Sequence, residues 1–292
     1  MKMFPDITMI EKPDPLVTGE GTPQMPEIAG FKEQLALFYC ANRRDFPWRE
    51  NITPYRIVVS EIMLQQTGVE RVLGKFEPFV ARFPDFYSLA GAPLADVMNV
   101  WQGLGYNRRA LSLKKLTGIV MEKYSGGLPE NPGLLRALPG IGDATAGAIM
   151  AFAFNLPSVF IETNIRRVFI HHFFPDREKV ADSDIVPIVA AAIDRSCPRE
   201  WYYSLMDYGT YLGAISVNPN RKSTRYSRQS PFQDSDRQVR GKVIKSLIGG
   251  GKASAEDLSG MTGCLPERLI PILESLIKDG LIKRDKGLYR IA

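Results

Sequence analysis

Apolar residues recur every three or four positions along most of this chain, which is the spacing of one face of an amphipathic helix. The first such stripe runs through Phe31, Leu35, Leu37, Phe38 and Ala41. Pro54 suits the first turn of the next helix, whose apolar positions end at Leu64. Further stripes predict helices over about residues 69–82, 93–101, 106–124, 132–137, 143–155, 163–173, 182–194 and 199–212. Because strand-like alternation is nearly absent before residue 280, the main body is predicted to be all-α.

The same pattern divides the chain into four parts. Residues 1–27 hold many prolines and few periodic apolar positions, which is typical of a flexible arm. Residues 28–212 carry the main helical stripes, and residues 213–235 are polar and irregular. Residues 236–292 combine three shorter helical stripes with two terminal strands around a tight turn, so we predict a small winged helix-turn-helix domain. Such domains usually bind duplex DNA through the third helix, and a protein-contact or dimerisation role is the alternative.

Composition excludes several classes of protein. The chain has 292 residues, of which 45% are hydrophobic, but no apolar run approaches the roughly 18 residues that span a bilayer. The first residues lack the uninterrupted apolar core of a secretory signal, so we expect a cytoplasmic protein with no membrane partner. The three cysteines are widely spaced and the two histidines are adjacent, so neither residue type predicts a metal site. A net charge of +5 permits a polyanionic partner without requiring one.

Positive charge is concentrated in one irregular segment, from Asn218 to Pro231. This segment contains no acid and carries four basic residues, Arg221, Lys222, Arg225 and Arg228. Because most runs of charge are solvated loops, that is the simplest interpretation of the segment by itself.

The segment Pro139-Gly140-Ile141-Gly142 predicts a tight turn between two helices. Glycine reaches backbone conformations that residues with a Cβ resist, and exposed amides at a helix N-terminus bind anions. Leucines precede this turn and apolar residues at helical spacing follow it, which is helix–hairpin–helix patterning. Such a hairpin binds the DNA backbone without reading sequence, through its amides and often through a monovalent cation held by its carbonyls. A plain turn between packed helices is the alternative.

Two glutamates lie beside predicted helices in different settings. Glu61 is inside a predicted helix with apolar residues on both sides, where burial would raise its pKa and make it a proton donor near neutrality. Glu162 precedes a helix start, where the helix dipole favours an ionised carboxylate. Two such acids could divide the proton-donor and anion roles that cleavage of an N-glycosidic bond needs. Each one alone is more simply interpreted as a solvent-facing acid or a helix-start acid.

Five motifs occur in an order that resembles one family. They are FPWR followed by TPYRIVVSEIMLQQTGVERV, then VWQGLGYNRRALSL, LPGIGDATAGAIMAFAF, IETNIRRV and MDYGTYLG. Over about residues 30–230 the chain resembles the adenine DNA glycosylase branch of the endonuclease III superfamily. The resemblance implies a helix-hairpin-helix DNA glycosylase fold of two α-helical subdomains with an active-site cleft between them. It also implies that the target nucleotide is flipped out of duplex DNA into this cleft.

The resemblance assigns roles to individual residues. Glu61 matches the family's general acid, which protonates the adenine. Glu162 matches the second carboxylate, which is aspartate in the family, and Asn164 matches the asparagine of that motif. Positions that enter the duplex or contact the opposite base correspond to Gln65, Gln66 and Tyr106, although a core aromatic at a helix start is the alternative for the tyrosine. Relatives use the region of Arg221, Lys222, Arg225 and Arg228 on DNA, which favours phosphate contacts for these four side chains.

Two departures from the family change the expected chemistry. Ala144 occupies the position where bifunctional relatives carry a lysine nucleophile, and alanine cannot form a Schiff base. The family's last motif is usually followed by four cysteines that hold a [4Fe–4S] cluster. Alignment of MDYGTYLG places these positions at Gly213, Asn220, Ser223 and Gln229, where the spacing is kept and every thiolate is absent. We therefore predict base excision without strand cleavage, no iron–sulfur cluster and no other cofactor besides the hairpin cation.

The resemblance and the departures together favour a monomeric DNA glycosylase of base excision repair. Its expected substrate is double-stranded DNA in which adenine is mispaired with guanine or 8-oxoguanine. The family typically ends in a Nudix-like domain that helps recognise 8-oxoguanine, and residues 236–292 are too short for that domain. An enzyme that removes thymine or uracil from mispairs with guanine is the first alternative, since related branches share most motifs. A non-catalytic DNA-binding protein is the second, which Glu162 and Ala144 leave open.

Overall fold

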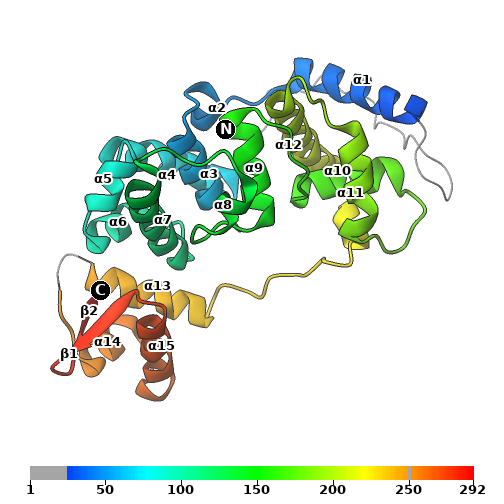
Figure 1. Ribbon diagram of the computed structural model, residues 1–292. Helices are drawn as coiled ribbons and strands as arrows, with labels where there is room; N and C mark the ends of the chain where they lie inside the picture. Colours follow the sequence, from blue (N-terminus) through cyan, green and yellow to red (C-terminus); the bar gives the residue numbers. More distant parts are fainter. Residues whose placement is uncertain (1–24, 249–250) are drawn as a thin grey trace. The chain divides into compact units, whose positions relative to one another are not determined.

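The structure, a computed structural model, describes residues 25–248 and 251–292, so most of the predicted N-terminal arm lies outside the described residues. Helices dominate both described ranges, and the strands assigned there are two short ones near the C-terminus (Figure 1). The prediction of an all-α main body is therefore confirmed. Among the described residues, no helix combines the length and the apolar character needed to cross a bilayer.

The chain forms two compact units, each built from two separate stretches of sequence. One unit comprises the described residues up to Ile52 together with Asp143–Arg228, and the other comprises Thr53–Gly142 together with Gln229–Ala292. We call them the first and the second unit. The four-part division expected from sequence, with boundaries after residues 27, 212 and 235, stays a prediction.

The second unit begins with six helices that surround an aromatic core. They are α3 (Pro54–Leu64), α4 (Val69–Arg82), α5 (Phe86–Gly91), α6 (Leu94–Trp101), α7 (Arg108–Tyr124) and α8 (Pro132–Arg136). Helix α7 packs against α3, α5 and α6, and α4 packs against α3 and α6. Phe76, Phe79, Leu89 and Trp101 are fully buried. This packing holds α3, which carries one of the predicted acids, along most of its length.

Local signals explain where these helices begin. Thr53 caps α3, since its Oγ1 accepts a hydrogen bond from the amide of Arg56 (3.2 Å), and Pro54 supplies the favoured first residue. Helix α5 is absent from the periodicity prediction because it is only six residues long. The residues at its start nevertheless indicate a helix, because Asp85 and Ser88 form a reciprocal capping box.

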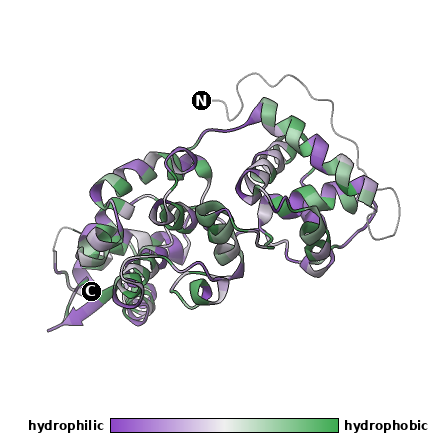
Figure 2. Cartoon of the chain, turned by 45° about the horizontal axis from the view of Figure 1, so that its top comes forward, coloured by the Kyte–Doolittle hydropathy of each residue, from purple (hydrophilic) through white to green (hydrophobic). Residues whose placement is uncertain are grey.

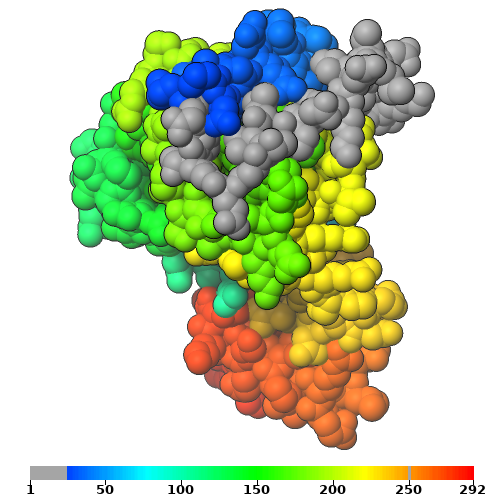
Figure 3. All heavy atoms as spheres, turned by 90° about the vertical axis from the view of Figure 1, so that its right-hand side faces the viewer, coloured from blue at the N-terminus to red at the C-terminus, as the bar shows by residue number. Residues whose placement is uncertain are grey.

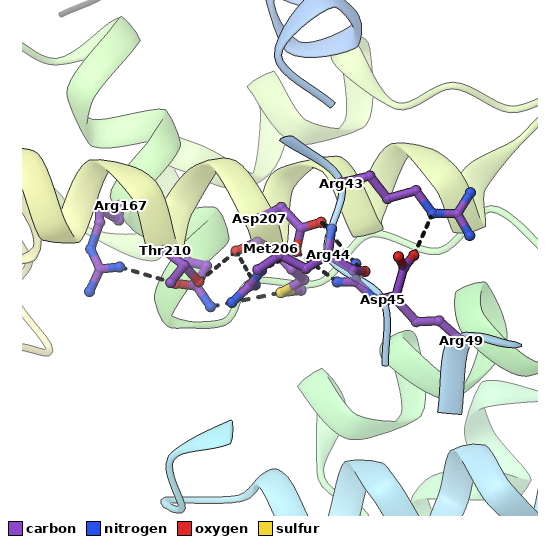
Figure 4. Close-up of polar contacts among 9 residues, drawn as sticks. Arg43, Arg44, Asp45, Arg49, Arg167, Met206, Asp207 and Thr210 are labelled. Atoms are coloured by element: carbon purple, nitrogen blue, oxygen red, sulfur yellow. Dashed lines mark hydrogen bonds and ion pairs between the residues drawn. The ribbon is translucent and has the colours of Figure 1, made fainter. Parts of the chain in front are cut away.

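The first unit is built around a long central helix. Its elements are α1 (Met25–Asn42), the one-turn α2 (Pro47–Glu50), α9 (Asp143–Phe154), α10 (Thr163–Phe173), α11 (Asp182–Ala192), α12 (Pro198–Ile215) and a 3-10 turn, η1 (Pro219–Lys222). Helix α12 packs against α1, α9 and α10. Its buried Asp207 accepts hydrogen bonds from Arg44 Nε (2.7 Å) and from Arg49 Nη1 (2.8 Å) and Nη2 (2.9 Å), as Figure 4 shows. Two guanidinium groups thus compensate one buried carboxylate.

Helix α1 differs from its prediction at its start and in its buried face. It begins at Met25, because the buried stripe includes Ile28 and continues through Phe31, Leu35 and Phe38. Leu37 was assigned to the apolar stripe but is 65% exposed, since it lies off this face of the helix. The alternation of green and purple bands along α1 in Figure 2 reflects this one-sided burial.

Residues 236–292 form the predicted order of three helices and a hairpin. The helices are α13 (Asp236–Leu247), α14 (Ala255–Thr262) and α15 (Pro266–Lys278), and strands β1 (Ile282–Asp285) and β2 (Leu288–Ile291) pair antiparallel. We call this part the C-terminal domain; in Figure 3 its atoms run from gold at α13 to red at the hairpin. Val243, Leu258, Leu269, Leu273, Leu276, Ile282 and Ile291 form its core. Assignment to the winged helix-turn-helix class stays a prediction.

Candidate active site and DNA-contact residues

Glu61 lies in the middle of α3, where it is the only residue between Ile57 and Met63 that is not buried. Ser60 and Ile62 on either side have no exposed surface, whereas Glu61 is half-buried. The Ser60 hydroxyl donates to the carbonyl of Ile57 (3.0 Å), so that hydroxyl is turned into its own helix. The packing of α3 therefore leaves one partly accessible position in an apolar stretch, and a carboxyl group occupies it.

The turn after α3 places Gln65 against the predicted DNA-binding hairpin. Gln65 Nε2 donates to the carbonyl of Gly140 (3.0 Å). Gln66 has a φ of +52°, which is uncommon for a residue with a Cβ, and its side chain is exposed. The structure thus brings together two predicted DNA-contact segments that are about 75 positions apart in the sequence. One of the hairpin carbonyls expected to hold a cation is the acceptor of this hydrogen bond.

Tyr106 is a half-buried loop residue, and the core-aromatic alternative is therefore not what the structure shows. Its φ is +47°, and the preceding Gly103 and Gly105 also have positive φ values of +90° and +71°. Within the second unit, the Tyr106 hydroxyl accepts hydrogen bonds from Arg237 Nη1 (3.1 Å) and from Gln229. A strained loop with an amphipathic ring at its end suits contact with DNA bases.

Arg109 joins the turn after α3 to the loop before Tyr106, a role that the sequence pattern does not predict. Its Nη1 donates to the carbonyls of Ile62 (2.9 Å), Met63 (2.7 Å) and Gln65 (2.5 Å). Its Nη2 donates to Thr67 Oγ1 (2.9 Å) and to the carbonyls of the glycine-containing loop before Tyr106 (3.2 Å each). Burial lowers the pKa of Arg109 to about 10, which leaves it charged at neutral pH. The only signal in the sequence was a pair of arginines at the start of a helix.

In the hairpin, the requirement for glycine differs between its two glycines. Gly140 has a φ of +84°, and a Cβ there would lie 3.0 Å from Ser112 Cβ, so both conformation and space require glycine. Gly142 has an ordinary φ and open space around it. The Ile141 side chain is buried and its amide donates to the carbonyl of Leu138 (3.2 Å), so this amide is engaged within the hairpin. Of the hairpin amides predicted to bind phosphate, that of Ile141 is therefore already used within the turn.

Glu162 is the N-cap of α10. Its Oε1 accepts hydrogen bonds from the amides of Asn164 (2.5 Å) and Ile165 (3.1 Å). Desolvation raises the pKa of Glu162 above its ordinary value, although these amides and the charges of Arg166 and Arg167 act in the opposite direction. The helix start was expected to favour the ionised carboxylate, and desolvation of this half-buried side chain acts against that preference.

Asn164 is held between α10 and α12. Its Oδ1 accepts a hydrogen bond from Arg167 Nη1 (3.1 Å), and its Nδ2 lies 3.9 Å from Met206 Sδ. Arg167 also donates to the carbonyl of Gly209 (2.5 Å), and Figure 4 shows this side chain beside Met206 and Thr210. Glu162 and Asn164 therefore lie together in the first unit, whereas Glu61 belongs to the second unit.

The four predicted phosphate contacts differ in how they are engaged. Lys222 donates to the carbonyl of Pro175, and Arg225 pairs with Asp182 (3.2 Å). Arg221 and Arg228 are exposed and form no ion pair within the described residues. The last two are accordingly the side chains most readily available to a polyanion.

The residues at the four cluster positions do not fit an iron–sulfur group. A Cβ at Gly213 would lie 2.6 Å from Arg167 Nη1, so the arginine fills that space. Asn220 Nδ2 donates to the carbonyl of Thr163 (2.9 Å), and Ser223 Oγ accepts from the amide of Arg225 (3.1 Å). The cysteines lie elsewhere, at Cys40, Cys197 and Cys264, and three thiolates are one too few for such a cluster. Hydrogen bonds and packing hold this segment together.

Comparison with protein families and curated proteins gives consistent matches. Residues 59–186 match the model of the HhH-GPD superfamily base excision DNA repair proteins. An adenine DNA glycosylase of Mycobacterium tuberculosis (strain CDC 1551 / Oshkosh) is 30% identical over 301 residues, covering 93% of this chain and 94% of that protein. An adenine DNA glycosylase of Buchnera aphidicola subsp. Baizongia pistaciae is 38% identical over 149 residues, and the match spans 51% of this chain but only 42% of that protein.

Among solved structures, a thermostable thymine-DNA glycosylase is similar to this chain. The TM-score is 0.61 at 26% sequence identity, and the match covers 67% of this chain and 91% of the other. This similarity confirms the predicted helix-hairpin-helix architecture of the main body. The chain is therefore similar in fold to a thymine-DNA glycosylase and similar in sequence to proteins named adenine DNA glycosylase.

Proposed function

We propose, from the premise that this chain belongs to the HhH-GPD superfamily of base excision DNA repair proteins and there to the family of the adenine DNA glycosylases, that it is a monofunctional DNA glycosylase. Its substrate is double-stranded DNA that contains adenine mispaired with guanine or 8-oxoguanine, and the reaction is hydrolysis of the N-glycosidic bond of that adenine. The protein acts as a cytoplasmic monomer.

The position of Glu61 relative to the hairpin is the observation that best supports this proposal. Glu61 precedes Gln65 by four positions, so the two residues lie on the same side of the end of α3. Gln65 in turn contacts Gly140 of the hairpin (3.0 Å). The half-buried Glu61 is therefore one helical turn away from Gln65, whose side chain contacts the hairpin that is predicted to bind DNA. That is where an acid must be if it is to act on a nucleotide drawn out of the bound duplex.

The chemistry follows from the two carboxyl groups. Glu61 donates a proton to the adenine ring and makes it a better leaving group. Glu162, in its ionised form, stabilises the positive charge that develops on the sugar as the bond to the base lengthens. Water then completes the hydrolysis. Because Ala144 offers no amine, the enzyme forms no Schiff base and leaves the DNA strand intact.

The enzyme works without an iron–sulfur cluster. The donor set at residues 213, 220, 223 and 229 contains no thiolate, and Arg167 and Asn220 supply hydrogen bonds at that place. Purified protein is expected to be colourless and to contain no iron in stoichiometric amount. A brown preparation whose visible absorbance is lost on reduction or chelation would contradict this part of the proposal.

An excision assay on defined duplexes tests the substrate. Single-turnover rates on A·8-oxoG, A·G, T·G and U·G duplexes are compared, with a fully paired duplex as control. Excision of adenine from the first two supports the proposal, and excision of a pyrimidine alone overturns it. A monovalent cation at the hairpin is tested in the same assay by exchanging potassium for a bulky organic cation.

Substitution of the proposed acid tests the mechanism. Glu61→Gln keeps the size of the side chain and removes its proton-donating carboxyl, so excision should fall by at least about 100-fold while duplex affinity stays unchanged. The matched control is Glu70→Gln in α4, an exposed glutamate that should leave the rate unaltered. If Glu61→Gln turned over at the normal rate, the acid would have to be another group.

A thymine or uracil glycosylase acting on mispairs with guanine is the second candidate. It is favoured by the structural similarity to the thermostable thymine-DNA glycosylase, which extends over 91% of that chain. The same panel of duplexes separates the two candidates, because each predicts excision of a different base.

A further inference from the structure

The C-terminal hairpin is extended by a third chain segment. Strands β1 and β2 pair antiparallel, with Ile282 opposite Ile291 and Lys283 opposite Arg290. Ala253 forms an antiparallel bridge with Tyr289, through hydrogen bonds of 3.1 Å and 2.8 Å in both directions. Continuing this pairing by one residue places Lys252 opposite Arg290. Residues 252, 290 and 283 therefore form a row across three neighbouring segments.

The two faces of this small sheet differ in composition. On one face, Ala253, Tyr289, Ile282 and Ile291 are buried in the core of the C-terminal domain, and Arg284, the partner of Tyr289, is exposed. Because side chains alternate along a strand, the side chains of residues 252, 290 and 283 lie on the opposite, outer face of the sheet. Lys252 and Lys283 are exposed and Arg290 is half-buried.

This outer face places three positive charges next to one another. Like charges directly opposite each other on paired strands destabilise a sheet, and segments of a sheet are only about 4.8 Å apart. None of the three side chains forms an ion pair within the described residues, and Arg290 Nε is buried without a hydrogen-bond partner. Lys286 adds a fourth cation at the turn, and Asp285, two residues after Lys283 on the same face, is the only acid of the hairpin. An external anion would relieve this repulsion.

Helix α15, the third helix of the domain, lacks such a surface. Its exposed side chains include Glu267, Glu274 and Ile270, the last of which is 48% exposed. Its Arg268 is already paired with Asp236 (2.9 Å). Two acids and an apolar residue on the exposed face disfavour approach to a phosphate backbone. The closely spaced positive charges of this domain that could attract DNA lie on the hairpin, whereas Lys245 and Lys278 are single exposed lysines on α13 and α15.

We propose that the outer face of the C-terminal hairpin, formed by Lys252, Arg290 and Lys283, binds the phosphate backbone of duplex DNA without reading its sequence. The expectation that such a domain contacts DNA through its third helix is thereby replaced by contact through the hairpin. In Figure 3 the hairpin, in red, lies at the surface of its domain. The contact adds affinity for DNA in general and leaves the choice of base to the main body of the protein.

Two matched double variants of the full chain test this inference. Lys252→Gln with Lys283→Gln removes two charges from the hairpin face, and Lys245→Gln with Lys278→Gln removes two exposed lysines from α13 and α15. Affinity for a fully paired duplex is measured by fluorescence anisotropy over a series of salt concentrations. The hairpin variant should bind about tenfold more weakly at low salt, and its slope of log affinity against log salt should shrink by roughly one per lysine. The control variant should match the parent protein.

The variants distinguish DNA contact through the hairpin from DNA contact through α15. Equal affinity and slope for both double variants would overturn the proposal, as would weaker binding by the control variant alone. A third variant, Glu267→Gln with Glu274→Gln, should leave the slope unchanged; a steeper slope would place α15 on the DNA instead. Thermal midpoints within a degree or so of the parent show that the hairpin variants are folded. Because the duplex contains no mispair, the result does not depend on which base the protein excises.

Discussion

At the scale of single residues, Arg109 links the two loops that the sequence assigned to DNA. Its guanidinium reaches the end of α3 and the loop before Tyr106 at the same time. Both loops contain a residue with positive φ, Gln66 and Tyr106, and such conformations persist only where the surroundings hold them. Arg109 is therefore a positioning residue, because its hydrogen bonds hold the two loops.

Replacement of Arg109 should have a large effect on stability. Arg109→Gln leaves several buried carbonyls without a donor, so the free energy of unfolding should fall by about 2–5 kcal/mol. Arg108→Gln is the control, because Arg108 is mostly exposed and its contact with Asp279 is long (3.5 Å). The control should lose less than about 1 kcal/mol. Urea denaturation of the three proteins measures both values, and similar losses for the two variants would contradict the assigned role.

At the scale of elements, the close approach of α10 and α12 organises the first unit. A Cβ at Gly209 would lie 2.7 Å from the carbonyl oxygen and 2.8 Å from the Cα of Asn164. Gly213, one turn later, leaves room for the guanidinium of Arg167. That arginine binds Asn164, Gly209 and Asn218, so it ties α10 to α12 and to the segment that follows α12. Small residues on α12 thus allow the Arg167 side chain to reach its three partners.

Gly209→Ala tests this helix contact. The new methyl group meets backbone atoms that cannot move independently, so we expect a loss of about 2–3 kcal/mol of stability. Gly118→Ala in α7 is the matched control, because a Cβ there has no neighbour within 4 Å. In a helix interior this change should be neutral or stabilise the protein by up to about 1 kcal/mol. Equal effects of the two substitutions on the urea midpoint would show that α10 and α12 are not in tight contact at this position.

At the scale of the whole molecule, a buried histidine makes stability depend on pH. His172 has no exposed surface, stacks on Tyr208 and shares a hydrogen bond with its hydroxyl (2.8 Å). Burial lowers the pKa of His172 from 6.5 to about 3. Below pH 6.5 the imidazole of His172 therefore binds a proton in the unfolded chain but not in the folded protein. The free energy of unfolding accordingly falls as the pH falls from 6.5 towards 3. Glu162, whose pKa is raised, acts in the opposite direction just above its ordinary value of 4.5.

His172→Gln should flatten this dependence. Below pH 6.5 the parent protein should lose up to about 1.4 kcal/mol of stability for each pH unit relative to the variant. Above pH 6.5 the difference between the two proteins should be constant, because neither side chain is then charged. Urea denaturation at a series of pH values between 7.5 and 4.5, chosen to span about two units below the histidine's ordinary pKa, measures this difference. Parallel stability curves would show that His172 titrates alike in both states.

Periodicity predicted most helices because it records which face of each helix is buried. It located α3, α7, α10 and α12 within a few residues of their observed bounds. It failed for α5, which is too short to show a stripe, and for Leu37, which lies off the buried face of α1. Among candidate site residues, the sequence named Gln65 and Gly140, but only the structure joined them through a hydrogen bond.

What the sequence determined by itself is the chemistry that is present or absent at each position. Residue types alone show a carboxyl group at residue 61, no amine at residue 144 and no thiolates at the four cluster positions. Tertiary structure decided how these groups are held. Burial raises the pKa of Glu162, Arg109 connects two distant loops, and cations line up on the outer face of the C-terminal hairpin. The reason is physical: residue type sets which bonds and charges a group can offer, whereas solvation and partners depend on atoms far away in the chain.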